Sequence, residues 1–110
     1  MTAAEVAKSV RDIVDAYRPT LTTQEFVGQR IPLDQELAEV ELLRKSLVLP
    51  SRRSVSNTRK RDVWLVAQHG GDIVFFDESA NEFGLGRLEA DGRIHDIEVP
   101  GDLVGCFMAR

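Results

Sequence analysis

The sequence is poor in the residue types that build most catalytic and metal centres. Its 110 residues include one cysteine, Cys106, and two histidines, His69 and His95. A single cysteine can form neither an internal disulfide nor a multi-cysteine zinc site, so a secreted disulfide framework is excluded. We therefore assign no catalytic residue, no metal and no cofactor. Cys106 lies in an apolar segment and is expected to be a small core residue.

Long hydrophobic runs are also missing. No segment approaches the roughly 20 apolar residues that a membrane-spanning helix needs. Charged residues interrupt the first segment at Glu5, Lys8 and Arg11, so it lacks the apolar core of a signal peptide. With 43% hydrophobic and 29% charged residues, the composition is typical of one globular domain covering residues 1–110. We expect a cytoplasmic protein that does not contact membranes.

Charge is distributed unevenly, although the formal net charge is only −4. Residues 51–61 carry five basic side chains and no acid, whereas residues 62–110 carry ten acids and three bases. A run of like charge usually forms a solvated segment. We predict a mobile basic loop over 51–61, which is also a candidate docking patch for an acidic partner or for phosphates. Its basic residues are Arg52, Arg53, Arg59, Lys60 and Arg61.

The first fifty residues have the apolar spacing of helices. Thr2 and Glu5 have the spacing of a capping box, and an apolar stripe follows them. A proline disfavours helical geometry just after Tyr17, so the first helix should end there. A second helix is predicted over 33–47, with acids early and bases late, as the helix dipole favours. A short capped turn is expected over 22–28.

The remaining residues predict an antiparallel meander. Two β-rich runs flank a Gly-Gly pair at 70–71, which is typical of a hairpin. With these glycines as a two-residue loop, His69 should lie opposite Asp72 and Leu65 opposite Phe76. The predicted sheet therefore begins with a tight hairpin.

Three further strands are expected over 83–89, 94–99 and 103–108. An Asp-Gly pair predicts a tight turn between the first two. In that register Leu88 lies opposite His95, which would point toward the buried face. His95 is then either a partly buried structural histidine or a general base.

Acidic residues are numerous in the meander and are expected to be solvated. Those at the hairpin ends lack the spacing of a calcium-binding loop, and Asp96 falls on the polar face of its strand. The residues at the hairpin ends are Asp72, Asp77, Glu78 and Glu82.

Both faces of the predicted hairpin are apolar, which is the main inconsistency in the pattern. Two helices can cover one face, so the other needs a curled sheet, a terminal segment or a second protein molecule. We predict an α+β fold in which two N-terminal helices pack on a four- to five-stranded antiparallel meander. We also predict that the uncovered face forms a homodimer or binds another protein. This expected partner face consists of Trp64, Val66, Ile73 and Phe75.

One part of the hairpin resembles a known class of domain. The trace from Trp64 through the Gly-Gly pair and the Phe75-Phe76 pair to Phe83 is similar to small bacterial immunity-type α+β domains. The resemblance covers about twenty residues. It implies an α+β fold and binding of a partner protein.

The sequence favours a small non-enzymatic protein-binding or self-associating module. A first alternative is a small-molecule or catalytic pocket between the helices and a curved sheet, with His95 as the residue to examine. A second is an immunity-type domain that binds a partner protein. A third is nucleic-acid binding through the basic loop, which we do not favour because no aromatic residue interleaves the basic ones for base stacking.

Overall fold

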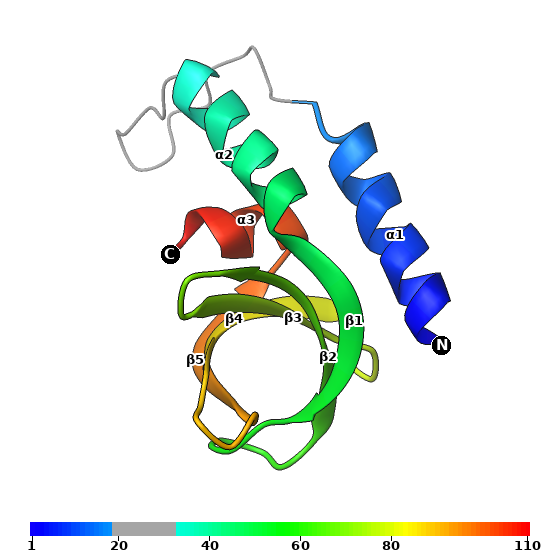
Figure 1. Ribbon diagram of the computed structural model, residues 1–110, viewed down its shortest axis with the longest axis vertical. Helices are drawn as coiled ribbons and strands as arrows, with labels where there is room; N and C mark the ends of the chain where they lie inside the picture. Colours follow the sequence, from blue (N-terminus) through cyan, green and yellow to red (C-terminus); the bar gives the residue numbers. More distant parts are fainter. Residues whose placement is uncertain (19–32) are drawn as a thin grey trace.

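Three helices and a five-stranded sheet form the computed structural model, which describes residues 1–18 and 33–110 (Figure 1). The sheet is antiparallel in the order β1-β2-β3-β4-β5, which confirms the α+β class and the predicted meander. The turn expected over 22–28 lies outside the described residues. The elements are α1 (Ala3–Ala16), α2 (Leu33–Ser46), β1 (Leu47–Ser54), β2 (Asp62–His69), β3 (Asp72–Asp77), β4 (Glu82–Leu88), β5 (Ile94–Gly101) and α3 (Leu103–Met108).

Helix α1 forms as its sequence predicts. The Thr2 side chain accepts a hydrogen bond from the Glu5 amide at 3.2 Å, and the Glu5 carboxylate accepts one from the Thr2 amide at 2.9 Å. These two bonds satisfy free donors of the first turn. The helix buries one face against the sheet through Val6, Val10 and Val14.

The basic segment is only partly a loop, so the prediction for 51–61 is wrong in its first part. Helix α2 ends at Ser46 and β1 begins at the next residue. Strand β1 includes Arg52 and Arg53, which pair with Trp64 and Val63 of β2. Pairing with a strongly β-forming neighbour therefore outweighs the local charge, because a strand can direct its charged side chains to solvent.

The β2–β3 hairpin has the predicted turn and a shifted register beyond it. His69 lies opposite Asp72, as expected, but Leu65 lies opposite Phe75 instead of Phe76. A β-bulge at Val66 causes the shift, because Val66 is an extra residue of β2 that has no partner on β3.

The strongly curled sheet separates two hydrophobic cores, and Figure 1 shows it bending almost into a ring below the helices. A parallel bridge between Val55 and Ile94 brings the end of β1 to the start of β5. Inside the ring lies an inner core of Val55, Val63, Leu65, Ile73, Phe75 and Ile94.

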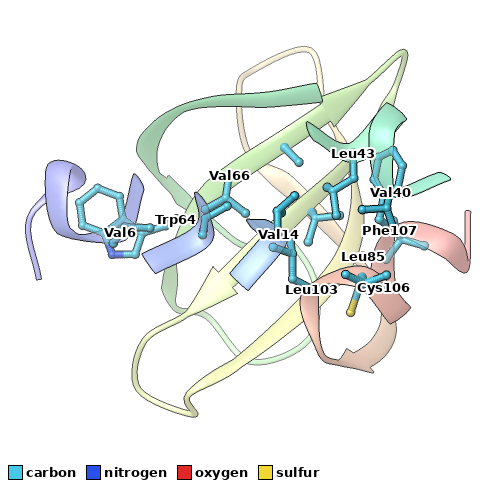
Figure 2. Packing of buried hydrophobic residues seen from close by; sticks show 14 residues of the cluster. Val6, Val14, Val40, Leu43, Trp64, Val66, Leu85, Leu103, Cys106 and Phe107 are labelled. Atoms are coloured by element: carbon cyan, nitrogen blue, oxygen red, sulfur yellow. The ribbon is translucent and has the colours of Figure 1, made fainter. Parts of the chain in front are cut away.

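The second core lies between the helices and the outer face of the sheet (Figure 2). Leu43 of α2 and Phe107 of α3 are among its most deeply buried side chains, together with Val66 from the bulge. The outer core therefore joins all three helices to the sheet.

The segment 103–108 is helix α3, so the expected fifth strand there is wrong. Short apolar runs fit either structure by period alone. Here the Asp102 side chain accepts from the Gly105 amide at 2.6 Å, as in a helix N-cap. The cap directs Leu103 and Phe107 into the outer core.

The β4–β5 turn is one residue longer than predicted. The Glu89 amide donates to the Arg93 carbonyl at 2.8 Å, and Gly92 adopts a φ of +86°. This left-handed residue is typical of a three-residue hairpin loop. The register therefore pairs Arg87 with His95.

Candidate functional site

The four residues of the expected partner face are buried inside the protomer. Trp64, the most accessible of them, is 7% exposed. Trp64 and Val66 belong to the outer core, whereas Ile73 and Phe75 belong to the inner core. The curled sheet covers the second apolar face, so these residues neither share a surface nor require a second molecule. Dimerisation stays a prediction, but it is no longer supported by an uncovered apolar face of the hairpin.

The five basic residues of 51–61 do not form one patch. The Arg52 guanidinium packs over the Trp64 ring, 5.0 Å from its centroid. Arg53 donates from Nη1 to the Gly92 carbonyl at 3.3 Å. Arg59 and Lys60 are exposed beyond the end of β1. The remaining residue of the set, Arg61, is largely buried.

Arg61 ties the segment after β1 to two other parts of the sheet. Its Nε donates to Asp77 Oδ2 at 2.8 Å and its Nη2 donates to Asp96 Oδ2 at 3.1 Å. The Arg61 side chain is only 18% exposed, and those of Asp77 and Asp96 are 3% and 10% exposed. The expectation that these two acids are solvated is therefore wrong. Their carboxylates are buried, and the ion pairs with Arg61 compensate for the loss of water.

The Asp77 carboxylate is held in its ionised form. Burial raises the pKa of Asp77, but hydrogen bonds from Ser79, Arg61 and Ala80 outweigh burial and leave it below its ordinary value. Asp77 Oδ1 accepts from the Ser79 hydroxyl at 2.7 Å and from the Ala80 amide at 3.3 Å. A carboxylate with this many donors is a structural ion and a poor proton carrier.

Asn57 closes the sheet next to the Arg61 ion pairs. Its side-chain nitrogen donates to the Asp96 carbonyl at 2.8 Å, and its side-chain oxygen accepts from the Asp96 amide at 2.7 Å. The amide group thus continues the contact between β1 and β5 that the Val55–Ile94 bridge begins. Asn57 and Arg61 therefore anchor both ends of the turn that carries Arg59 and Lys60.

Limited digestion with trypsin should distinguish the two parts of the basic segment. We expect early cleavage after Arg59 or Lys60, and protection of Arg52 and Arg53 by pairing of β1 with β2. Mass spectrometry of the first fragments measures the order of cleavage. Early cleavage after Arg52 or Arg53 would contradict the assignment of β1 as an ordered strand.

The two histidines and the cysteine do not come together in a catalytic arrangement. His69 and His95 are exposed, and His95 faces away from both cores. Cys106 is buried, and desolvation raises the pKa of its thiol to about 11, so the nucleophilic thiolate is disfavoured. In the described part of the chain, no group of three or more His, Cys, Asp or Glu side chains could hold a metal ion. No described helix is long and apolar enough to cross a membrane.

A groove between α1, the end of α2 and β1 is a candidate binding site. It has a volume of about 530 Å³. Leu49 stands at this groove with 81% of its surface exposed, although β1 residues on either side of it are half-buried or buried. The apolar part of the lining consists of Ala7, Val10, Leu47, Val48, Pro50 and Val66.

The polar lining of the groove comes from the two helices. Arg44 of α2 pairs closely with Asp15 of α1, and its Nε lies 3.6 Å from Glu41. Arg11 of α1 also lines the groove. Its side chain makes no hydrogen bond or ion pair with any residue in 1–18 or 33–110. The described lining of the groove thus consists of apolar residues, the ion pair between Arg44 and Asp15, and the unpaired guanidinium of Arg11.

Sequence reasoning missed this groove because it interpreted Leu49-Pro50 only as the end of a helix. The available signal was an apolar run, Leu47 to Leu49, placed before Pro50 and a charged segment. Such a run predicts a strand as readily as a helix end. Its exposure depends on how α1 packs, which the local pattern does not contain.

Comparisons with known proteins give no relative to guide the assignment: no protein-family model, no curated protein and no solved structure matches the chain. The resemblance to bacterial immunity-type domains stays a prediction. The functional argument therefore rests on the groove and its residues.

Proposed function

We propose that this chain is a non-enzymatic protein-binding module that holds its partner in the groove between α1 and β1. The exposure of Leu49 at the groove carries the proposal. Fully burying a leucine side chain stabilises a complex by about 1.5–3 kcal/mol. Such a side chain beside an apolar hollow is a natural anchor for a partner.

Leu49 differs from the other exposed aliphatic side chains. Leu37 on α2 and Ile97 on β5 are 49% and 39% exposed, and neither lines the groove. Scattered apolar residues of that kind are ordinary on protein surfaces. Leu49 instead lines the groove together with the half-buried Leu47 and Val48, so its exposed side chain adjoins other apolar surface.

The alternatives have less support in the geometry. A catalytic pocket built on His95 would need that histidine to face the helix–sheet interface, and it is exposed opposite Arg87. Nucleic-acid binding through 51–61 would need the basic side chains of this segment on one surface. Arg61 instead forms ion pairs with the carboxylates of Asp77 and Asp96. Self-association through the groove belongs to the same class of function. We also keep the cytoplasm as the proposed location, since the lone cysteine needs no oxidising compartment.

Photo-crosslinking from the groove tests the proposal. Leu49 is replaced by p-benzoylphenylalanine, and the matched control carries the same substitution at Leu37, which is exposed on α2. After irradiation in a lysate of the source cells, we expect a covalent adduct from position 49 that is absent from position 37. Mass spectrometry identifies the attached chain, and two linked copies of this protein would indicate self-association. If position 49 gives no specific adduct, the groove is not the binding surface.

A further inference from the structure

In the part of the chain that the structure describes, each cation at or beside the groove is paired with a carboxylate, except one. On α1, the Lys8 ammonium lies 2.7 Å from the Asp12 carboxylate. Arg44 is neutralised by Asp15 and lies near Glu41. Arg11 is the groove cation with no counterion in the described ranges 1–18 and 33–110. Within the described residues, the groove therefore presents one positive charge without a counterion beside its apolar lining.

We infer that the groove binds a short acidic, apolar segment of a partner protein, with an apolar side chain against Leu49 and a carboxylate at Arg11. This inference rests on the proposed function and specifies the chemistry of its partner. An arginine guanidinium matches a carboxylate in shape as well as in charge. Charge complementarity of this kind selects partners more than it adds affinity.

The edge of β1 argues for insertion of a side chain into the groove, and against addition of a partner strand to the sheet. The register of β1 against β2 shifts between Leu47 and Ser51, and Pro50 within this stretch has no amide hydrogen to donate. Bulges, prolines and charged residues are features that protect edge strands from pairing with other chains. The side chains of Leu49 and Arg11 at the groove are exposed, and they carry the recognition.

The acidic character of the whole chain does not prevent such a partner from binding. Most of the negative charge belongs to residues 62–110, which contribute only Val66 to the groove lining, and exposed charges are screened beyond about 8 Å at physiological ionic strength. A carboxylate placed at Arg11 responds mainly to that guanidinium. Raising the salt concentration should therefore weaken the complex only moderately, since Leu49 supplies an apolar contribution that salt does not screen.

Selection from a random peptide library tests this inference, because the groove itself then chooses the ligand chemistry. Decapeptides displayed on phage are selected in parallel against the wild-type chain, Arg11→Glu and Lys8→Gln. Lys8 is the matched control, since it lies on the same helix, carries the same charge and does not line the groove. Glutamine is chosen there because a glutamate three residues before Arg11 would supply it with a counterion. We expect the wild type and Lys8→Gln to enrich peptides in which Asp or Glu neighbours an apolar residue. Arg11→Glu should lose that preference.

Titration of one selected peptide then gives the size of the effect. Replacing the attraction by a repulsion should weaken binding to Arg11→Glu by roughly tenfold, since an exposed ion pair is modest in strength. Lys8→Gln should bind within about twofold of the wild type, because Lys8 does not line the groove and its charge is paired with Asp12. Circular dichroism confirms that all three proteins are folded.

The outcomes separate this inference from the proposed function. Apolar peptides without an acidic preference, whose binding is lost in Leu49→Asp, would overturn the role of Arg11 and leave the groove as the binding surface. Peptides that bind Leu49→Asp as well as the wild type would contradict both. Failure to enrich any peptide overturns this inference, and the crosslinking experiment then decides the proposed function.

Discussion

Replacing Arg61 with methionine is expected to lower the free energy of unfolding by about 2–4 kcal/mol at pH 7. Removing one partner from a buried ion pair leaves an uncompensated charge in the interior, which costs about 3–5 kcal/mol. The lower range applies because Arg61 is 18% exposed and water reaches part of the site. Both Asp77 and Asp96 lose the cation between them. Denaturant unfolding monitored by the fluorescence of the single tryptophan, Trp64, measures the change.

Arg59→Gln is the matched control for this prediction. Arg59 lies 4.0 Å from the same Asp77 carboxylate, but its side chain is 73% exposed. Exposed pairs contribute about 0–1 kcal/mol, so this variant should unfold close to the wild type. Equal losses in the two variants would show that burial of Arg61 is not what makes its ion pairs important.

The loss in Arg61→Met should also depend on pH in a definite direction. The pKa of Asp77 is below its ordinary value of 3.8 in the folded protein. Its contribution is therefore complete above pH 3.8 and disappears as the pH falls through the lower folded value. Without Arg61 the folded pKa rises, so acid protonates the orphaned carboxylate and removes its buried charge. The difference between wild type and variant should shrink as the pH falls toward 3, and a constant difference would contradict this explanation.

Gly84→Ala is expected to destabilise the protein by about 3 kcal/mol, at the upper end of the range for overpacked cores. A methyl group at Gly84 would lie 2.2 Å from Cζ of Phe75 and 2.7 Å from its Cε2. The Phe75 ring packs in the inner core beneath Gly84, which lies opposite it on β4. Because the sheet curls around the ring, Phe75 has little room to move. Thermal and denaturant unfolding both measure the loss.

Two companion variants identify the clash as the cause. Gly71→Ala introduces the same methyl group where no atom lies within 4 Å, so its effect should be below about 1 kcal/mol. Phe75→Leu shortens the side chain beneath Gly84, and the double variant should lose less stability than the sum of the single variants. A coupling energy of at least about 1 kcal/mol is expected for groups in contact. Strict additivity would exclude the steric explanation.

The sequence predicted what short-range periodicity determines. The capping box at Thr2, the stripe that continues it and the turn at Gly70-Gly71 are local patterns, and the structure contains them. The β-bulge at Val66 has no comparable signal, yet it decides which residues of the hairpin face which core. A one-residue shift reverses the face of every later side chain, so a small error in register displaced the expected partner face.

The features most relevant to function depend on contacts between distant segments. Arg61, Asp77 and Asp96 come from three different parts of the sequence, and each alone resembles a solvated charge. Strand β1 forms because β2 pairs with it, although its own composition suggests a loop. The groove exists only where α1 and β1 meet. Reasoning from single segments therefore identified α1, α2 and the strands β2 to β5. It missed β1, α3, the buried ion pairs and the candidate site.

The direct junction of α2 with β1 has a mechanical consequence. Helix α2 ends at Ser46 and β1 starts at Leu47, so no loop residue separates them. The Ser46 hydroxyl donates to the Leu42 carbonyl at 2.6 Å, a bond within the last turn of the helix. A displacement of Leu47 by a molecule in the groove would therefore act directly on that turn, with no loop between them to absorb it.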